Sequence, residues 1–307
     1  MGEGAVSLID CLGYKGIWQK ADPDTILNQL KTIQQKSNLS LDAGIFQLQQ
    51  QLGYRIRVSF LSDTVAIGFD VPKANALPDR DKGKLLHMAA QLAQKIAGEF
   101  LRMTLPLAMR GCVVYGRFEM NDNFLIGPAV DEAAEWHEKA DGAFIWIPPT
   151  YASLIEAMRH AAVQPNMKFI DTSQAIIAVA RSYFPQDQAQ RVRERLNAKN
   201  EEQRHKIHTA FLELIRSPAN NWNLFSYALP LKGGERLDCL VVDPVDPSWG
   251  RPEARRQYEL AMRSDATDVI KKRENTLKFF DHAQKDREDA APIVQEHVNH
   301  LNQLLYG

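Results

Sequence analysis

Residues 57–69 read R-V-S-F-L-S-D-T-V-A-I-G-F, and this stretch decides the fold that the sequence predicts. Apolar residues run up to Ser62-Asp63 and resume directly after it, a pattern typical of two buried strands joined by a tight turn. An acidic residue at the tip has two explanations. Turn chemistry favours Asp at such positions, and a metal ion would require a carboxylate there. The rest of the chain has to distinguish between them.

The composition indicates a globular protein without a general nucleic-acid-binding surface. The chain has 307 residues, enough for one large domain or two ordinary ones, with 45% hydrophobic and 24% charged residues. Its 37 basic and 38 acidic residues give a net charge of −1, whereas nucleic-acid-binding domains are strongly basic. We therefore expect no nucleic-acid partner.

The cysteines and the apolar segments predict a cellular location. Cys11, Cys112 and Cys239 fit no zinc-binding spacing, which favours a reduced, intracellular protein. The first residues do not resemble a signal peptide, and no window approaches the roughly 20 apolar residues that span a bilayer. We expect a cytoplasmic protein with no direct membrane contact.

The order of elements predicts an α+β fold in which helices pack on an antiparallel-rich sheet. In the first part of the chain we expect a strand in A-V-S-L-I-D-C, a helix over 23–52, the hairpin around Asp63 and a helix over 82–104. There follow a strand in M-R-G-C-V-V-Y-G-R-F-E-M, a segment F-L-I leading into a helix D-E-A-A-E-W-H-E-K-A, and a strand in A-F-I-W-I. The last part comprises a mostly helical region over 150–220, a hairpin that turns at 232–235, and helices from 252 to 306 that split near 290–292. The predicted domains are residues 1–250, with a helical insertion at about 150–220, and a helical C-terminal extension over 251–307.

Asp10 and Asp63 occupy corresponding positions, each at the end of an apolar strand. If these strands are neighbours in one sheet, their carboxylates meet at one edge. Paired carboxylates suit Mg²⁺ or Mn²⁺, which prefer oxygen ligands and bind together with substrate phosphates. The loop after Asp10 offers backbone N–H groups to phosphate oxygens. Taken singly, each Asp also fits an ordinary turn or cap residue.

Five segments, in order, resemble motifs of the class III nucleotidyl cyclases. They are I-D-C-L-G-Y (9–14), S-F-L-S-D (59–63), R-G-C-V-V-Y-G (110–116), F-L-I-G-P-A-V-D-E-A-A-E (124–135) and Y-A-L-P-L-K-G-G-E (227–235). The resemblance implies a cyclase-like domain over residues 1–250, with a ferredoxin-like or palm-type sheet. It also implies that Asp10 and Asp63 hold two divalent cations, Mn²⁺ or Mg²⁺, with the backbone carbonyl of Cys11 as a further ligand.

The same resemblance assigns positions to the substrate. Leu12, Gly13 and Tyr14 would lie along the triphosphate, and Lys232 would reach the phosphates. The reaction would be attack of the ribose 3′-oxygen on the α-phosphorus with loss of pyrophosphate, which depends mainly on positioning and on charge neutralisation.

Four positions depart from the purine cyclases. Ser59 replaces the Lys or Glu that reads the base edge, and Phe124, which fills space instead, replaces the second base-reading residue. Asp131 and Glu135 fall where a transition-state Asn and Arg are usual, and an acidic group does not stabilise a developing negative phosphate. The chain therefore needs another cation, or it is inactive.

With these departures the chain resembles the bacterial pyrimidine nucleotidyl cyclases of the Pycsar antiphage systems. That resemblance implies a homodimer that converts UTP or CTP to a 3′,5′-cyclic monophosphate. The product would activate a cyclic-nucleotide-responsive effector during phage infection. UTP is favoured over CTP only because uridylate cyclases are the commoner members of this group.

Several residues keep two interpretations. Arg110, Arg57 and Arg117 are candidates for the replacing cation, or they are an anchor at a strand start and two exposed strand residues. Tyr54 would stack on a pyrimidine or pack in the core. The eight histidines form no cluster with metal-ligand spacing.

Two other functions remain as alternatives. Asp131 and Glu135 favour a cyclase-like nucleotide sensor that binds without turnover. The other alternative is a relative of diguanylate cyclases or polymerase palms, which also carry acidic residues in a hairpin. Their expected G-G-[DE]-[DE]-F turn is absent, because the turn here reads L-S-D-T.

Overall fold

The computed structural model describes residues 1–14, 16–39, 54–71, 77–121, 124–161, 198–216, 223–245 and 249–306. The chain divides into two compact units. The first combines residues 1–158 with 223–283, and the second combines 159–222 with 284–307. The predicted domain boundary at residue 250 stays a prediction. No helix within the described ranges is long and apolar enough to cross a membrane.

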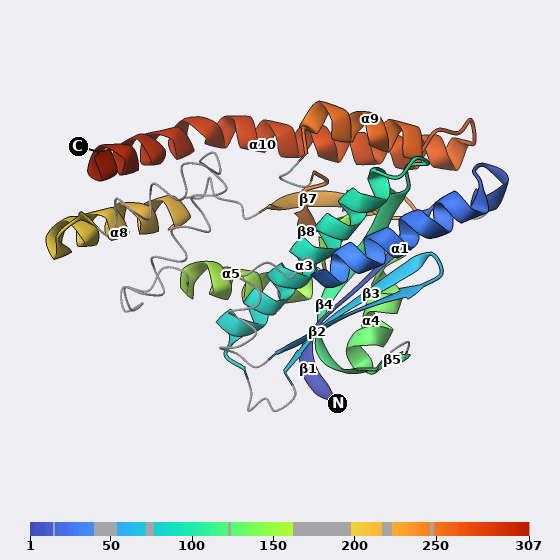
Figure 1. The fold of residues 1–307 in the computed structure, drawn as a ribbon, viewed down its shortest axis with the longest axis horizontal. Coiled ribbons are helices and arrows are strands. Elements are labelled where there is room, and N and C mark those ends of the chain that lie inside the picture. Colours follow the sequence, from blue (N-terminus) through green and yellow to red (C-terminus); the bar gives the residue numbers. More distant parts are fainter. Residues whose placement is uncertain are drawn as a thin grey trace. The chain divides into compact units, whose positions relative to one another are not determined.

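The first unit is built on one mixed sheet in the order β2-β3-β1-β4-β6-β8-β7, with β5 paired to β4 outside this path (Figure 1). All pairings are antiparallel except that of β4 with β6. The predicted α+β class, an antiparallel-rich sheet with packed helices, is confirmed. The strands are β1 (Gly2–Leu12), β2 (Arg55–Leu61), β3 (Thr64–Val71), β4 (Ala108–Asn121), β5 (Phe124–Ile126), β6 (Ile145–Ile147), β7 (Leu224–Pro230) and β8 (Arg236–Val242).

Helices lie on both faces of the sheet. In antiparallel pairs, residues directly opposite one another point to the same face, and successive residues alternate. Phe60 of β2 stacks on Phe100 of α3 (Asp79–Leu101), which places α3 on one face. Gly116 of β4 approaches Ala129 of α4 (Pro128–Trp136) from the opposite face. Asp10 lies opposite Arg110, which is six residues from Gly116 on β4 and therefore points to the same face. Asp10 thus points to the α4 face.

The remaining helices and the core follow from apolar spacing. Short 3₁₀ turns cover Ile17–Gln19 and Pro149–Tyr151, and the other α-helices are α1 (Pro23–Leu39), α5 (Ala152–Ala161), α8 (Glu201–Arg216), α9 (Arg251–Ala261) and α10 (Thr267–Tyr306). The main core contains the buried aromatic residues Phe69, Phe100, Phe118, Phe144, Trp146, Phe225 and Phe279. Phe279 attaches the start of α10 by edge contacts to Phe144 and Phe225.

Two helix boundaries differ from the prediction. The helix expected over 23–52 ends at Leu39, and residues 40–53 lie outside the described part. The split expected near 290–292 was wrong, because α10 continues through Pro292 to Tyr306. A proline inside a helix removes one backbone hydrogen bond without necessarily ending it. The break lies instead between Met262 and Thr267, where the Ser264 hydroxyl accepts a bond from the backbone N–H of Ala266.

The second unit is helical in the part that is described. Its elements are α8 and the C-terminal part of α10. Buried apolar residues recur at helical spacing on both, namely Ile207, Ala210 and Leu214 on α8 and Val298, Leu301 and Leu305 on α10. This spacing is that of amphipathic helices. The predicted helical character of 150–220 is confirmed for α5 and α8, and residues 162–197 lie outside the described ranges.

Gly83 allows α3 to approach α5 closely, and replacing it with Ala should destabilise the first unit. A Cβ at this position would lie 2.0 Å from the backbone carbonyl oxygen of Leu154. Ala gains about 1 kcal/mol of helix propensity over Gly, but forcing the two backbones apart costs more, so we expect a net loss of about 1–2 kcal/mol. Urea unfolding of Gly83→Ala measures it. The exposed α3 substitution Gln91→Ala is the control and should change stability little; equal stability of both variants would contradict the close packing.

Candidate functional site

The ends of β1 and β3 bring Asp10 and Asp63 to one end of the sheet. Asp10 pairs with Thr64 in the register, and the backbone N–H of Cys11 donates to the carbonyl of Asp63 at 2.9 Å. The turn is tight because Ser62 adopts a φ of 61°, as the first residue of a two-residue hairpin loop does in II′ turns. The predicted hairpin and the predicted adjacency of the two strands are confirmed.

Asp10 is held by Arg110 directly across the β1–β4 pair. The two residues are opposite one another in the register. Arg110 Nε donates to Asp10 Oδ1 at 3.0 Å, and Nη2 donates to Oδ2 at 3.2 Å. The side chains are only 9% and 12% exposed, so this is a buried, two-pronged ion pair. Of the three candidate arginines, Arg110 is the one that reaches Asp10.

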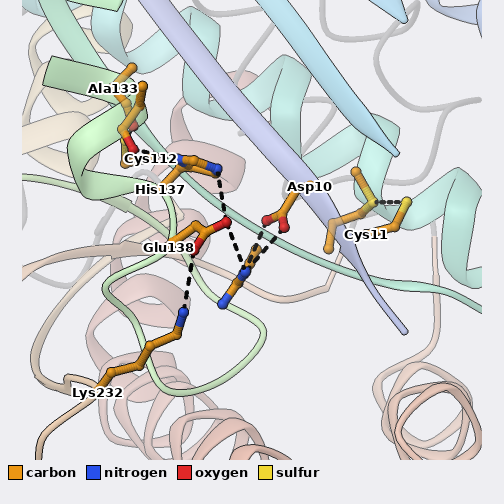
Figure 2. A network of polar contacts seen from close by, with 10 residues as sticks. Asp10, Cys11, Cys112, Ala133, His137, Glu138 and Lys232 are labelled. Atoms are coloured by element: carbon orange, nitrogen blue, oxygen red, sulfur yellow. Dashed lines mark hydrogen bonds and ion pairs between the residues drawn. The ribbon is translucent and has the colours of Figure 1, made fainter. Parts of the chain in front are cut away.

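Glu138 joins this ion pair to a second cation. Its Oε1 lies 3.8 Å from Arg110 Nη2, and its Oε2 lies 3.5 Å from Lys232 Nζ. Figure 2 shows Lys232 and His137 approaching Glu138 from different sides. The pKa of the Glu138 carboxyl is lowered, first by Arg110 and then by Lys232, against a smaller opposing effect of burial, with His137 adding to the lowering. Glu138 is therefore ionised at neutral pH.

Local backbone structure places Glu138 and Lys232 together. Helix α4 begins after Gly127, whose φ of 130° few other residues adopt. The helix contacts β4 where the Cys112 thiol donates a hydrogen bond to the Ala133 carbonyl, with Sγ 3.3 Å from the oxygen. The segment after α4 then meets the β7–β8 turn, where the Lys232 N–H donates to the carbonyl of Lys139 at 2.8 Å. The glycines at 233 and 234 close that turn with positive φ.

The chain opens into a loop after β1 ends at Leu12. Gly13 has a φ of 77°, and a Cβ there would meet nothing within 4 Å, so the backbone is accessible. Leu12 is partly buried against a second apolar cluster with Tyr258 and Phe280. Burial, then Cys11 and Asp63, raise the pKa of Tyr14, so its hydroxyl stays protonated at neutral pH and lies near the acidic turn.

Cys11 is a buried core thiol. Its Sγ lies 3.1 Å from Met109 Sδ, and its pKa is raised by burial, then by Asp10 and Asp63. The side chain is therefore inert at neutral pH, which is compatible with the predicted role of its backbone carbonyl.

Ser59 and Arg57 lie on the same sheet face as Asp10. Through the register, Ser59 lies opposite Ala66 and Arg57 opposite Gly68. Ser59 is buried. Arg57 Nη1 is 4.0 Å from Glu119 Oε1. Its register partner on β1 is Val6, four residues from Asp10, which corresponds to roughly 13 Å along the strand.

Three predicted residues lie away from Asp10. Tyr54 is 1% exposed and contacts Phe69 and Met88 on the α3 side, so its predicted stacking on a base is wrong and it packs in the core. Phe124 is 77% exposed on β5, and in this chain it fills no pocket beside Asp10. Arg117 is exposed on β4, roughly 23 Å along the strand from Arg110.

Asp131 and Glu135, for which the resemblance predicts transition-state positions, lie exposed on α4. Asp131 is in the first turn of α4, where the helix dipole stabilises a carboxylate. Glu135 accepts a hydrogen bond from Lys139 Nζ at 2.6 Å, and that ammonium also lies 3.8 Å from the Trp136 ring centroid. Glu135 thus binds a cation rather than supplying one.

His137 and Glu138 were missed by the sequence interpretation. They follow α4 directly, and no spacing rule connects them to Asp10, 127 residues earlier. Yet Asp10, His137 and Glu138 each offer a ligand atom within 4.8 Å of the others. The only sequence signal is their adjacency at the end of the segment that resembles a cyclase motif.

No protein-family model and no curated protein matches this sequence. Among solved structures, similar chains are the catalytic core of a rhodopsin-guanylyl cyclase with converted specificity in complex with ATPαS (14% identity, 50% of this chain and 82% of that chain, TM-score 0.36) and the guanylyl cyclase Cya2 (15%, 50% and 81%, TM-score 0.35). A third is the monomeric guanylyl cyclase domain of the RhoGC fusion protein from the aquatic fungus Blastocladiella emersonii (13%, 51% and 86%, TM-score 0.34).

Removing Arg110 should destabilise the protein more than removing the whole ion pair. Arg110→Met leaves the buried Asp10 carboxylate without its partner, which costs about 3–5 kcal/mol. The double variant Asp10→Asn/Arg110→Met leaves no buried charge and should recover part of that loss. Unfolding free energies in a double-mutant cycle measure the coupling. Simple additivity of the two single losses would contradict an energetically coupled pair.

Proposed function

We propose that this chain is a metal-dependent nucleotidyl cyclase that acts on a pyrimidine nucleoside triphosphate, UTP or CTP. The observation that carries the proposal is the alignment of β1 with the β2–β3 hairpin, which brings Asp10 and Asp63 to the same end of the sheet through the bond from Cys11 N–H to the Asp63 carbonyl. Turn chemistry alone explains one Asp. It does not explain two at the same end, beside an open glycine loop and two cations.

The donor atoms at this end fit divalent cations. Asp10 and Asp63 supply carboxylate oxygens, and the carbonyl of Cys11 is close by in the chain, a donor set that suits Mn²⁺ or Mg²⁺. Bound ions of this kind supply charge neutralisation of the triphosphate and activation of the attacking oxygen. An ion held there would compete with Arg110 for the Asp10 carboxylate.

The chain's own residues account for the rest of the chemistry. The open backbone at Gly13 is available to phosphate oxygens. Arg110 and Lys232, both near Glu138, offer the positive charge that Glu135 does not. Attack of the ribose 3′-oxygen on the α-phosphorus forms the ring and releases pyrophosphate, so orientation and charge are what the protein must provide.

Ser59 supports a pyrimidine rather than a purine. It is buried on the Asp10 face, at the position where the purine cyclases carry a longer base-reading residue. A hydroxyl on a short side chain reaches less far than Lys or Glu. The further proposals are that the cyclic monophosphate product activates an effector in antiphage defence and that UTP is the main substrate.

A direct assay tests the activity. The full chain is incubated with each of ATP, GTP, UTP and CTP and with Mn²⁺ or Mg²⁺, and products are identified by mass. We expect a 3′,5′-cyclic pyrimidine monophosphate and pyrophosphate, with the rate lowered at least about a hundredfold by Asp63→Asn. The exposed Asp238→Asn is the matched control and should retain activity. Full activity of Asp63→Asn, or cyclic product from none of the four nucleotides, would refute the enzyme.

A nucleotide sensor without turnover is the second candidate. It is favoured by the acidic residues Asp131 and Glu135 on α4. Glu135 stands where an arginine is expected, and its carboxylate is bonded to Lys139. Tight UTP or CTP binding in calorimetry, together with no pyrophosphate release in the assay above, would decide for the sensor.

We also propose that the chain works as a homodimer, supported by the exposed apolar side of β5. Phe124 and Ile126 are 77% and 59% exposed and lie two residues apart, so they share one face of the strand. Light scattering after size exclusion should give twice the chain mass, and Phe124→Ser/Ile126→Ser should shift it to the monomer. Leu260→Ser, at another exposed apolar position, is the control. A monomeric wild-type chain at all concentrations would contradict the dimer.

A further inference from the structure

The end of α4 adds two metal-binding side chains to Asp10. Asp10, His137 and Glu138 offer one nitrogen and two oxygen ligand atoms within 4.8 Å of one another. Atoms that bind one ion at about 2.1 Å lie within roughly 4.2 Å of one another. A shift of less than an ångström would therefore bring the three onto a common ion.

His137 is oriented as a ligand. Its Nδ1 lies 2.8 Å from the Ala134 carbonyl, and because a carbonyl only accepts, Nδ1 carries the hydrogen. In the neutral ring Nε2 then keeps its lone pair, which is the arrangement that metal-ligating histidines show when the other nitrogen donates to a backbone carbonyl. Nε2 faces Glu138 Oε1 at 3.8 Å, too far for a hydrogen bond. The ring is 18% exposed, so it is not simply a solvated surface residue.

The space between Asp10 and Glu138 already attracts a cation. Arg110 binds both oxygens of Asp10 and places Nη2 3.8 Å from Glu138. A purely structural network of Asp10, Arg110, Glu138 and Lys232 would balance its charges without an imidazole. His137 meets that network at Glu138, with Nε2 3.8 Å from Oε1, which is beyond hydrogen-bond distance. A metal ion that binds in the place of the Arg110 guanidinium would use this nitrogen as a ligand.

We propose that Asp10, His137 and Glu138 form a site for a divalent first-row transition ion, and that such an ion displaces Arg110 from Asp10. One imidazole and two carboxylates suit Mn²⁺, Fe²⁺ or Zn²⁺ better than Mg²⁺, which prefers oxygen ligands only. The inference shares Asp10 with the proposed function and names a different partner set for it. The released guanidinium becomes available to bind a phosphate with two parallel N–H bonds.

The test is direct Mn²⁺ binding by the full chain, followed by electron paramagnetic resonance of free and bound ion. We expect saturable Mn²⁺ binding that involves Asp10, and ¹⁴N modulation from a coordinated imidazole in pulsed spectra of the bound ion. His137→Gln should abolish the modulation and weaken binding at least about tenfold, and Glu138→Gln should weaken it similarly. Arg110→Gln should tighten binding because the competing cation is gone.

Controls and outcomes separate this site from the pair predicted first. His160→Gln and Asp238→Asn alter an exposed histidine and an exposed carboxylate outside the site, and both variants should bind Mn²⁺ as the wild type does. If Asp63→Asn abolishes binding while His137→Gln leaves it intact, the ion belongs to Asp10 and Asp63, and the proposal is overturned. Absence of ¹⁴N modulation in the wild-type chain overturns it as well, independently of how any variant folds.

The activity assay and the binding assay can each refute one proposal without refuting the other. Mn²⁺ binding with ¹⁴N modulation but without cyclic product would refute the cyclase and leave the metal site standing. Cyclic product with Mn²⁺ bound through oxygen atoms only would refute the site and leave the cyclase standing.

Discussion

The buried ion pair between Asp10 and Arg110 is the interaction on which the rest of the site depends. A carboxylate inside a sheet is costly unless a charge partner and hydrogen bonds compensate it. The register of β1 with β4 supplies that partner directly opposite, with two bonds in a nearly dry environment. Because the pair is fixed by strand register, it also fixes where the other charges gather, at the end of the sheet beside α4 and the β7–β8 turn.

In the proposed metal site, a divalent ion would compete with Arg110 for the Asp10 carboxylate. The guanidinium binds both carboxylate oxygens, and a cation bound to the same group would repel it. Glu138 lies 3.8 Å from Arg110 Nη2, so an ion that bound Glu138 as well as Asp10 would compete with the guanidinium at both carboxylates. On this proposal the chain would have one state stabilised by the ion pair without metal and another in which Arg110 is released toward an anionic ligand. Competition of this kind would couple metal occupancy to the charge presented to a triphosphate.

Local patterns predicted the fold well and the site only in part. The strand ending in Asp10, the hairpin at Asp63 and the late hairpin at Lys232 all carry turn chemistry between apolar runs, so their positions follow from sequence. The contacts of Asp10 do not, because they depend on register across β1 and β4 and on the place where α4 ends. His137 and Glu138 were invisible for that reason. Tyr54 kept two interpretations because an aromatic residue before a strand fits a core and a pocket, and its burial favours the core.

The acidic residues of α4 take on a different meaning once their partners are known. Glu135, at the position expected for a cation, accepts a hydrogen bond from Lys139, and Glu138 lies near Arg110 and Lys232 beside Asp10. Around Asp10 the charges of Asp10 and Glu138 balance those of Arg110 and Lys232, and Asp63 at the same end of the sheet adds one negative charge. Such a cluster does not attract a triphosphate strongly, whereas a divalent ion bound in it would leave a net charge of about one positive unit. Positive charge supplied only together with the metal would make nucleotide binding follow metal binding, which a fixed arginine on α4 would not do.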